Sequence, residues 1–167
     1  MVTTQKFNVT ISSDGSCKNN PGPGAYYAIV RCKGHERIAQ GYCPETTNNK
    51  MELRGVIEGI RLLTKPCNII LRCDSNYVLN NFQRLDEFKA SGWKQKNGKA
   101  VANCSLWKEL DELRKYHSFQ LVKVDAHSGD PDNERCDAGA KAIVQAHMPK
   151  CVEGSLHQFV TNVGISA

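Results

Sequence analysis

The sequence predicts an α/β domain in which a five-stranded mixed sheet is flanked by helices, and two observations support this fold class. Short segments with the period-two alternation of β-strands are interspersed with longer segments whose apolar residues recur at helical spacing. These segments follow one another as three strands, a helix, a strand, helices, a strand and a last helix, an order typical of a mixed sheet covered by helices. The length of 167 residues suits one such domain.

Three strands are expected near the start of the chain. Residues 7–12 alternate apolar and polar side chains, as a half-buried strand does. Residues 25–32 are expected to form the second strand, residues 33–35 a hairpin turn, and residues 36–42 the third strand. The segment 15–24 between the first two strands is rich in Gly, Asn and Pro, which predicts a turn.

A helix and a buried strand are expected next. Thr46 has the side chain of an N-cap residue, and the helix is expected to run to about Thr64. The apolar residues of this helix fall on a single stripe, which comprises Leu53, Val56, Ile57, Ile60 and Leu63. Residues 67–73 are a short apolar run, which suits a buried central strand.

The second half of the chain completes the pattern. Residues 75–85 and 103–116 are expected to be helical, and residues 119–124 alternate as a fifth strand. The last helix is expected to begin at Pro131, because proline is favoured at the first helical position, and Asp130 would cap it.

The overall charge is mildly positive. Lys and Arg number 22 against 17 Asp and Glu, so the formal net charge is +5, which by itself indicates only a weak attraction to polyanions. No run approaches the length of about 18 apolar residues that a membrane span needs. The N-terminus resembles neither a signal peptide nor an Arg-rich presequence. We therefore expect a cytoplasmic monomer with no membrane partner.

Eight cysteines are spread along the chain. They include no C-x-x-C pair, which argues against a tetrahedral structural zinc site. A disulfide framework would suit a short secreted chain, and this chain fits neither description. We therefore expect free thiols.

Four acidic residues lie on four separate predicted elements. Asp14 falls on the polar face of the first strand where that strand gives way to the turn, and Asp74 ends the buried strand. Glu52 lies in the first turns of its helix, and Asp137 lies about one and a half turns into the last helix. Each acid alone is also explained by a favourable helix dipole or by a turn. Together they could converge in space.

Each of these acids belongs to a longer motif. The motifs read DGSC at 14–17, NPGPG at 20–24, TTNNKMEL at 46–53, CDSNYV at 73–78 and HSGDPDNERCD at 127–137, with shorter matches at 92–94 and 103–107. The motifs follow the order of the type 1 ribonuclease H family and come close to its spacing, and they resemble the arrangement in its small single-domain cellular members. The resemblance implies a ribonuclease H-like fold for one domain, residues 1–167, with a motif-bearing core at about 7–146. The tail, residues 149–167, has no readable role.

The resemblance implies an endonuclease that cleaves the RNA strand of an RNA/DNA hybrid and leaves 5′-phosphate and 3′-hydroxyl ends. The four acids would be its catalytic carboxylates and would hold two divalent ions, Mg²⁺ with Mn²⁺ as a substitute. Two such ions provide a hydroxide nucleophile and neutralise the leaving oxygen. By resemblance, Asp14 would bridge both ions. His127 would be the family's mobile histidine, which assists proton transfer or product departure.

Several residues beside these motifs match positions that contact the substrate in the family. Asn20, Asn48, Asn49 and Asn76 match positions that touch sugars and base edges in the minor groove, where a protein reads shape and the 2′-hydroxyl. Thr47 matches a residue that grips a DNA phosphate. Taken alone, each of the four asparagines is also explained as an ordinary turn or cap residue.

A lysine-bearing segment lies between residues 88 and 101. It contains Lys89, Lys94, Lys96 and Lys99 with no acidic residue, and Trp93 frames it. The segment resembles the basic protrusion of the family, which would hold the hybrid backbone through phosphate contacts and counterion release. From the residues alone, a solvated lysine-rich loop is the other interpretation.

Other functions are left open by the sequence. One is a catalytically weak module that binds hybrids without cleaving them, and the presence of all four carboxylates disfavours it. Another is the ribonuclease H domain of a retroelement, which a complete set of elements after Met1 disfavours. A third is an integrase-like nuclease of the same fold class, which the loop at His127 and the basic segment disfavour.

Overall fold

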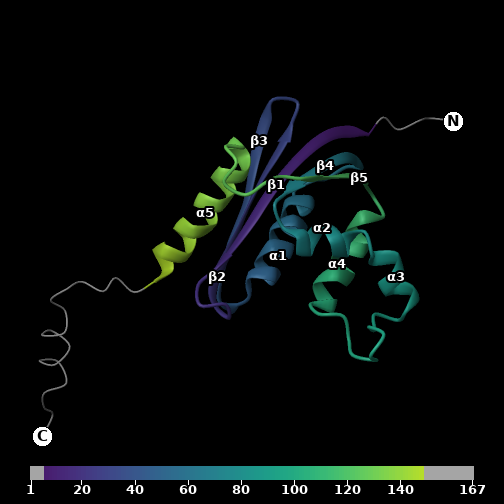
Figure 1. Ribbon diagram of the computed structural model, residues 1–167. Helices are drawn as coiled ribbons and strands as arrows, with labels where there is room; N and C mark the ends of the chain where they lie inside the picture. The colour runs from purple at the N-terminus through teal and green to yellow at the C-terminus, as the bar shows by residue number, and fades with distance from the viewer. Residues whose placement is uncertain (1–5, 149–167) are drawn as a thin grey trace, which may run out of the picture.

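A computed structural model describes residues 6–148 of the chain, and the expected tail at 149–167 lies outside the described residues. Five strands form one mixed sheet in the order β3-β2-β1-β4-β5 (Figure 1). Neighbours β1, β2 and β3 are antiparallel, whereas β4 pairs parallel with both β1 and β5. The strands are β1 (Phe7–Cys17), β2 (Gly22–Cys32), β3 (His35–Thr46), β4 (Cys67–Cys73) and β5 (Ser118–Lys123). The predicted fold class is therefore confirmed.

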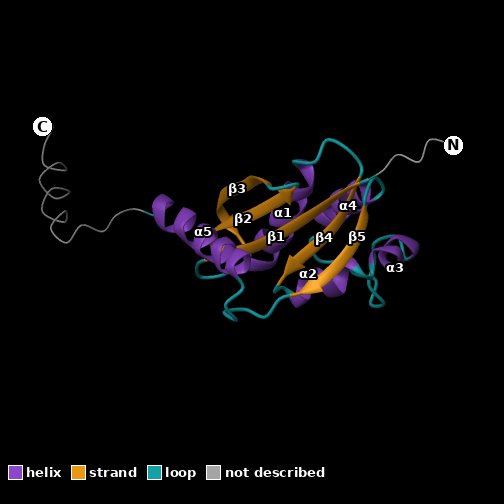
Figure 2. Cartoon of the chain, turned by 90° about the horizontal axis from the view of Figure 1, so that it is seen from above, coloured by secondary structure: helices purple, strands orange, loops and turns teal. Residues whose placement is uncertain are grey.

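Helices cover both faces of the sheet (Figures 1 and 2). They are α1 (Asn48–Arg61), α2 (Asn76–Phe82), α3 (Leu85–Ala90), α4 (Cys104–Arg114) and α5 (Pro131–His147). Helix α5 packs across β1, β2 and β3 on the face that bears Tyr27, against which Gly139 lies. Helix α1 packs on the opposite face, where Gly59 lies against Ile11 and Ala28. Tyr27 and Ala28 are adjacent in β2 and therefore point to opposite faces.

The main core lies between α1 and the sheet. The predicted stripe of α1 is fully buried at Leu53, Val56, Ile57 and Ile60, and α1 packs on β1 and β2. The same core cluster includes Ile69 and Leu71 of β4. Trp107 of α4 is also fully buried in this cluster. Burial of such side chains from water is the main favourable contribution to folding.

The first strands are longer than the sequence predicted. Strand β1 continues past residue 12 to Cys17, and β2 begins at Gly22, so the expected turn at 15–24 shrinks to four residues, 18–21. The small residues at 15–17 continue the antiparallel pairing with β2, and the last pair joins Cys17 to Gly24. As a result Asp14 does not end a strand. It lies inside β1, opposite Tyr27, and is buried.

Two helix boundaries also differ from the prediction. The N-cap of α1 is Thr47, whose hydroxyl accepts a hydrogen bond from the Lys50 backbone N–H at 3.3 Å, because β3 extends to Thr46. The expected helix 75–85 is shorter and a separate helix, α3, follows it. Buried residues continue at a spacing of three through this break, at Leu79, Phe82, Leu85 and Phe88, which explains why the sequence resembled one helix. The N-cap of α5 is Asp130, as predicted.

Candidate active site

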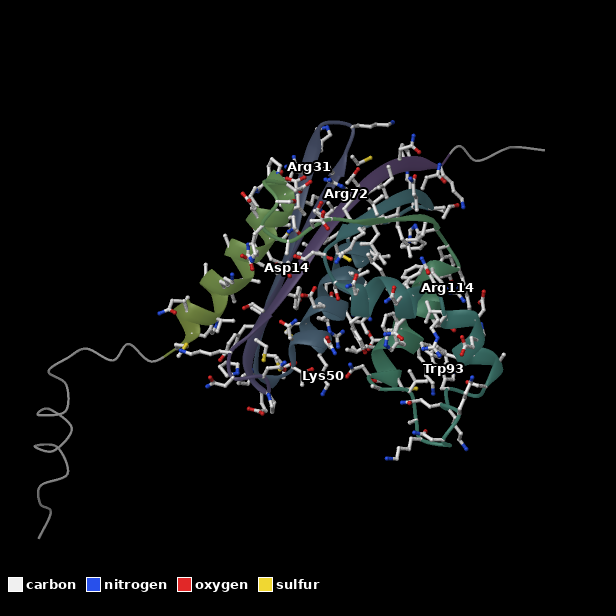
Figure 3. All side chains as sticks on the ribbon, viewed as in Figure 1. Asp14, Arg31, Lys50, Arg72, Trp93 and Arg114 are labelled. Carbon is white, nitrogen blue, oxygen red and sulfur yellow. The ribbon has the colours of Figure 1, made fainter. Side chains whose placement is uncertain are left out.

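Three of the four predicted carboxylates converge in the fold. Asp14 of β1, Glu52 of α1 and Asp74, directly after β4, each offer an oxygen, and the three oxygens lie within 4.8 Å of one another. Figure 3 shows Asp14 midway along the sheet, beside α5. Carboxylate oxygens at such separations repel one another unless protons or cations lie between them.

The close approach of α1 to β1 depends on Gly15. A Cβ atom at this position would lie 2.4 Å from the backbone nitrogen of Glu52, closer than any real contact. The absence of a side chain therefore lets the first turn of α1 lie directly on β1, which places Glu52 beside Asp14. The Gly15 backbone N–H also donates to Asp14 Oδ1 at 2.8 Å and so fixes that carboxylate.

Burial and mutual repulsion raise the pKa values of two of these groups. Burial raises the pKa of Asp14 to about 6, and the charges of Asp74 and Asp137 add to this increase. The pKa of Glu52 lies well above its ordinary value because the carboxyl is buried and faces the charge of Asp14. Glu52 Oε2 is buried and has no hydrogen-bond partner among the described residues. A buried, unpartnered carboxylate oxygen in a cluster of acids is the donor set that a hard divalent cation prefers.

Asp137 lies near the cluster and is not one of its three converging members. It lies on α5, and its Oδ2 accepts a hydrogen bond from Lys141 Nζ at 2.8 Å. Its charge nevertheless contributes to the raised pKa of Asp14, so the two carboxylates act on one another. The structure thus brings three predicted ligands together and holds the fourth beside them, paired with a lysine.

A chain of hydrogen bonds docks the start of α5 beside Asp74. Arg72 Nη2 donates to Asp130 Oδ2 at 2.5 Å, and Asp130 Oδ1 accepts from the Asn133 backbone N–H at 2.9 Å. The buried side chain of Asn133 donates through Nδ2 to Asp74 Oδ2 at 3.3 Å. The backbone oxygen of Asp74 also accepts from Lys123 Nζ. Sequence reasoning did not identify Asn133 or Lys123, because neither role follows from local spacing.

His127 is exposed in the loop between β5 and α5. Its φ angle of 55° and the φ of 88° at Gly129 give this loop a left-handed backbone, and Ser128 Oγ donates to the backbone oxygen of Asp125 at 2.7 Å. Within residues 6–148, no hydrogen bond or ion pair joins His127 to the carboxylates. Its predicted role is untested.

The five other polar residues of the motifs lie close to the start of the helices and loops that carry the acids. Asn20, in the β1–β2 turn, accepts through Oδ1 from the Asn48 backbone N–H at 3.1 Å, which ties this turn to the start of α1. Thr47 caps α1, and Asn49 follows as an exposed residue in its first turn. Asn76 is the exposed first residue of α2, two positions after Asp74.

The lysine-bearing segment has two different parts. Lys89 lies on α3 and forms an ion pair of 3.2 Å with the buried carboxylate of Asp111, so it has a structural partner. Lys94, Lys96 and Lys99 are exposed on a tight loop closed by a backbone bridge between 94 and 100.

A cavity of about 710 Å³ opens beside this loop, and Lys94 and Lys96 help to line it. Its other side includes Tyr77, whose hydroxyl accepts from Asn103 Nδ2 at 2.8 Å and Trp107 Nε1 at 3.2 Å. Trp93 is half-buried at a φ of 63°, with Lys108 Nζ 5.8 Å from its ring centroid.

Comparison with known proteins agrees with this geometry. The RNase H family model matches residues 6–145. The chain belongs to the RNase H family. It is 44% identical over 139 residues to a ribonuclease H of Nitratidesulfovibrio vulgaris, covering 82% of this chain and 89% of that protein. It is also 46% identical over 136 residues to the ribonuclease HI of Haemophilus ducreyi, with 80% and 88% covered. The type 1 ribonuclease H predicted from the motifs is confirmed.

Solved structures of RNase H proteins share the fold. LC9-RNase H1, described as a type 1 RNase H with the type 2 active-site motif, superimposes with a TM-score of 0.76 and 25% identity over 95% of this chain and 83% of that chain. LC11-RNase H1, solved in complex with an RNA/DNA hybrid, gives a TM-score of 0.61 at 17% identity over 83% of this chain and 98% of that chain. In the part of this RNase H chain that the structure describes, no helix is long and apolar enough to cross a membrane.

Proposed function

We propose that this chain is an endoribonuclease that hydrolyses the RNA strand of RNA/DNA hybrids with the aid of two divalent metal ions. The observation that carries the proposal is the convergence of Asp14, Glu52 and Asp74, within 4.8 Å, in a chain of the RNase H family. Relatives that are more than two-fifths identical bear the name ribonuclease H, and a protein of the same fold was solved with a hybrid bound.

The acidic cluster would bind the metal ions. Asp14, Glu52 and Asp74 would supply oxygen ligands, and the unpartnered Oε2 of Glu52 supports this assignment. Asp137 would complete the set from α5 after releasing Lys141. Bound divalent ions supply a hydroxide nucleophile at neutral pH and stabilise the negative charge on the leaving oxygen. Mg²⁺ suits hard carboxylate ligands and phosphate, and we propose Mn²⁺ as a substitute.

His127 would handle protons at the rim of the site. Its exposure in a loop with two left-handed residues supports a side chain that can approach and leave the cluster. We propose that its imidazole accepts or returns a proton, or assists the departure of the product.

Substrate recognition would rest on shape rather than on base sequence. We propose that the asparagines at 20, 48, 49 and 76 contact sugars and base edges in the minor groove, where the 2′-hydroxyl distinguishes RNA from DNA. Thr47 would contact a phosphate of the DNA strand. The exposed lysines at 94, 96 and 99, with Trp93, would hold the hybrid backbone. Lys89 would contribute less to phosphate binding, because it is already paired with Asp111.

One assay tests the proposal. A labelled RNA/DNA hybrid, an RNA duplex and a DNA duplex are each incubated with the protein and Mg²⁺, and the products are resolved by size. We expect cleavage of the RNA strand of the hybrid alone. The variant Asp74→Asn should lose at least about a thousandfold in turnover, equivalent to about 4 kcal/mol, while it still binds the hybrid.

The outcomes separate the candidate functions. Tight binding of the hybrid by the parent without cleavage would instead support the catalytically weak binding module. Turnover of Asp74→Asn near the parent level would contradict the metal-ion assignment. That the chain acts as a cytoplasmic monomer stays a prediction, which size-exclusion chromatography and localisation of the tagged chain would test.

A further inference from the structure

The cavity of about 710 Å³ beside the loop between α3 and α4 contains charges of both signs (Figure 1). Its lining includes three basic side chains, Arg84, Lys94 and Lys96, and one acidic side chain, Glu87. In the part of the chain that the structure describes, the two lysines form no ion pair with a carboxylate, whereas Arg84 pairs with Glu87. One of the three cations of the cavity is therefore neutralised by the chain itself.

The guanidinium of Arg84 is held from two sides. Its Cζ lies 4.8 Å from the centroid of the Phe88 ring, and Phe88 is buried. Its Nε donates to Glu87 Oε2 at 3.1 Å, and its Nη2 donates to Glu87 Oε1 at 2.9 Å. The carboxylate thus receives two hydrogen bonds from one edge of the guanidinium. Arginine binds a phosphate group through such an edge with the same two-bond geometry.

Glu87 carries a negative charge in this position. The hydrogen bonds from Arg84 lower the pKa of the Glu87 carboxyl, and the charge of Lys96 adds to this effect. The carboxyl is therefore ionised at neutral pH. A phosphate group that enters the cavity meets this negative charge beside two of the three cations.

An exposed ion pair between residues three positions apart is ordinarily a weak local contact. The protein contains another such pair on α4, where Lys115 Nζ lies 2.7 Å from Glu112 Oε1, and neither of these residues lines the cavity. The pair of Arg84 and Glu87 differs, because it rests on a buried aromatic ring and shares the cavity with unpaired lysines. A comparison of the two pairs therefore separates a local helix contact from a role in binding.

We propose that Glu87 is an internal substitute for a nucleic-acid phosphate, which masks Arg84 and so limits the affinity of the chain for the hybrid backbone. Two anions cannot occupy the same edge of the guanidinium. A phosphate that displaced Glu87 would leave that carboxylate unpaired and close to the charge of the phosphate. Arg84 therefore contributes little to binding in the parent, and it becomes a further phosphate contact when residue 87 is uncharged. The inference rests on the proposed function, because it takes the hybrid backbone as the ligand of this cavity.

Equilibrium binding over a range of salt concentrations tests the proposal. Fluorescence anisotropy of a labelled RNA/DNA hybrid is measured in a chelating buffer, which prevents metal-dependent cleavage. We expect Glu87→Gln to bind the hybrid about threefold or more tightly than the parent, because Arg84 no longer has to leave a carboxylate. The slope of log affinity against log salt should become steeper by about 1, as one added phosphate contact requires.

A double-mutant cycle assigns this gain to Arg84. In the Glu87→Gln chain, Arg84→Gln should weaken binding by about threefold or more and reduce the salt slope by about 1. In the parent, the same substitution should weaken binding by less than about 1.5-fold, because Arg84 is masked there. A general effect of negative charge would instead give the same gain from Glu87→Gln with and without Arg84.

Glu112→Gln is the matched control. It removes a carboxylate from an exposed pair of the same spacing outside the cavity. It should leave both the affinity and the salt slope as they are in the parent. Circular dichroism and thermal unfolding establish that all of the variants are folded.

The proposal is wrong if Glu87→Gln binds the hybrid like the parent, if the control gains as much, or if the full gain persists without Arg84. Cleavage of the hybrid with Mg²⁺, measured on the parent, tests the proposed function separately. A parent that cleaves, with no gain in Glu87→Gln, overturns the masking of Arg84 alone. The expected gain with a parent that does not cleave supports the masking and overturns the nuclease. If neither chain binds the hybrid, both are overturned.

Discussion

At the scale of a single residue, Gly15 decides whether the acidic cluster of Asp14, Glu52 and Asp74 can form. Its position against the backbone of Glu52 and Met51 leaves no room for a Cβ atom, since the nearest atoms would lie 2.4 and 2.6 Å away. The obstacle is backbone and not the flexible end of a side chain, so α1 as a whole would have to move away from β1. That movement would separate Glu52 from Asp14.

We expect Gly15→Ala to lower the free energy of unfolding by about 2–3 kcal/mol, the cost of forcing extra volume into a packed contact. Urea denaturation with circular dichroism measures this change. Gly55→Ala, in α1, is the matched control, because a Cβ atom at Gly55 would meet only ordinary contacts of 3.5 Å. That control should be neutral or stabilising by up to about 1 kcal/mol, since alanine is the better helix former. Equal stability of the two variants would show that the contact at Gly15 does not matter.

At the scale of elements, helix α5 both packs on β1, β2 and β3 and carries Asp137. Its first turn is fixed by the bonds from Arg72 to Asp130 and from Asn133 to Asp74. Because Asn133 is buried and donates to a carboxylate of the cluster, its amide orients that carboxylate as well as the helix. Outer hydrogen-bond partners of this kind tune metal affinity.

We expect Asn133→Ala to weaken Mg²⁺ binding by about 10–100-fold. Isothermal titration with Mg²⁺ measures the affinity directly, and the Mg²⁺ dependence of cleavage measures it independently. Glu36→Ala is the control, because it removes both oxygens that accept from Arg135 and so breaks a contact that ties α5 to β3 without touching the cluster. A similar loss of Mg²⁺ affinity in both variants would mean that Asn133 acts only through the docking of the helix.

The lysines of α3 and of the loop between α3 and α4 provide a second comparison between elements. Lys89 pairs with the buried Asp111, whereas Lys96 is exposed on the loop and lines the adjacent cavity. We expect Lys96→Ala to weaken hybrid binding and to reduce the slope of log affinity against log salt by about 1, as the loss of one phosphate contact does.

We expect Lys89→Ala to behave in the opposite way. It should leave the salt slope nearly unchanged and lower the stability, because it leaves Asp111 with Arg114 as its remaining partner. Filter binding over a range of salt concentrations distinguishes the two, with thermal unfolding as the second measurement. If Lys89→Ala also reduced the salt slope by a full unit, Lys89 would contact a phosphate as the exposed lysines of the lysine-bearing segment are proposed to do.

The whole molecule separates its charges into regions, which makes its stability depend on pH and on metal ions. The carboxyl pKa values of Asp14 and Glu52 are raised in the folded chain by burial and mutual repulsion. Such groups bind protons more strongly in the folded state than in the unfolded state. Their contribution to stability therefore falls as the pH rises from about 4 through about 6, and the loss is complete above the folded pKa values.

We expect Glu52→Gln to be more stable than the parent at pH 7 in a chelating buffer, because the raised pKa of Glu52 means that the folded chain disfavours its ionised form. The difference should disappear near pH 4, where the parent carboxyls are protonated. Adding Mg²⁺ at pH 7 should stabilise the parent and have less effect on the variant. Urea unfolding at the two pH values, with chelator and with Mg²⁺, is the measurement. A parent more stable than Glu52→Gln without metal would contradict the electrostatic account.

Local sequence patterns predicted most of the secondary structure. The apolar run at 67–73, the alternation that became β5 and the proline at the start of α5 depend on neighbouring residues only, and each was confirmed. The C-terminal end of β1 and the division between α2 and α3 were not predicted correctly. Both depend on partners far along the chain, since β2 extends β1 by backbone pairing and the core buries Leu85 and Phe88 on a second helix.

The sequence by itself determined the fold class, the family and the identity of the acids, because motif order and residue chemistry are properties of the chain. Only the tertiary structure decided that Asp14, Glu52 and Asp74 meet within 4.8 Å, while Asp137 is held by Lys141. It also decided that Lys89 pairs with the buried Asp111, and that Arg37 bonds to a backbone oxygen and pairs with no carboxylate of residues 6–148. The physical reason is that distances and ion pairs between distant residues arise from packing, such as the contact at Gly15, and local spacing does not encode them.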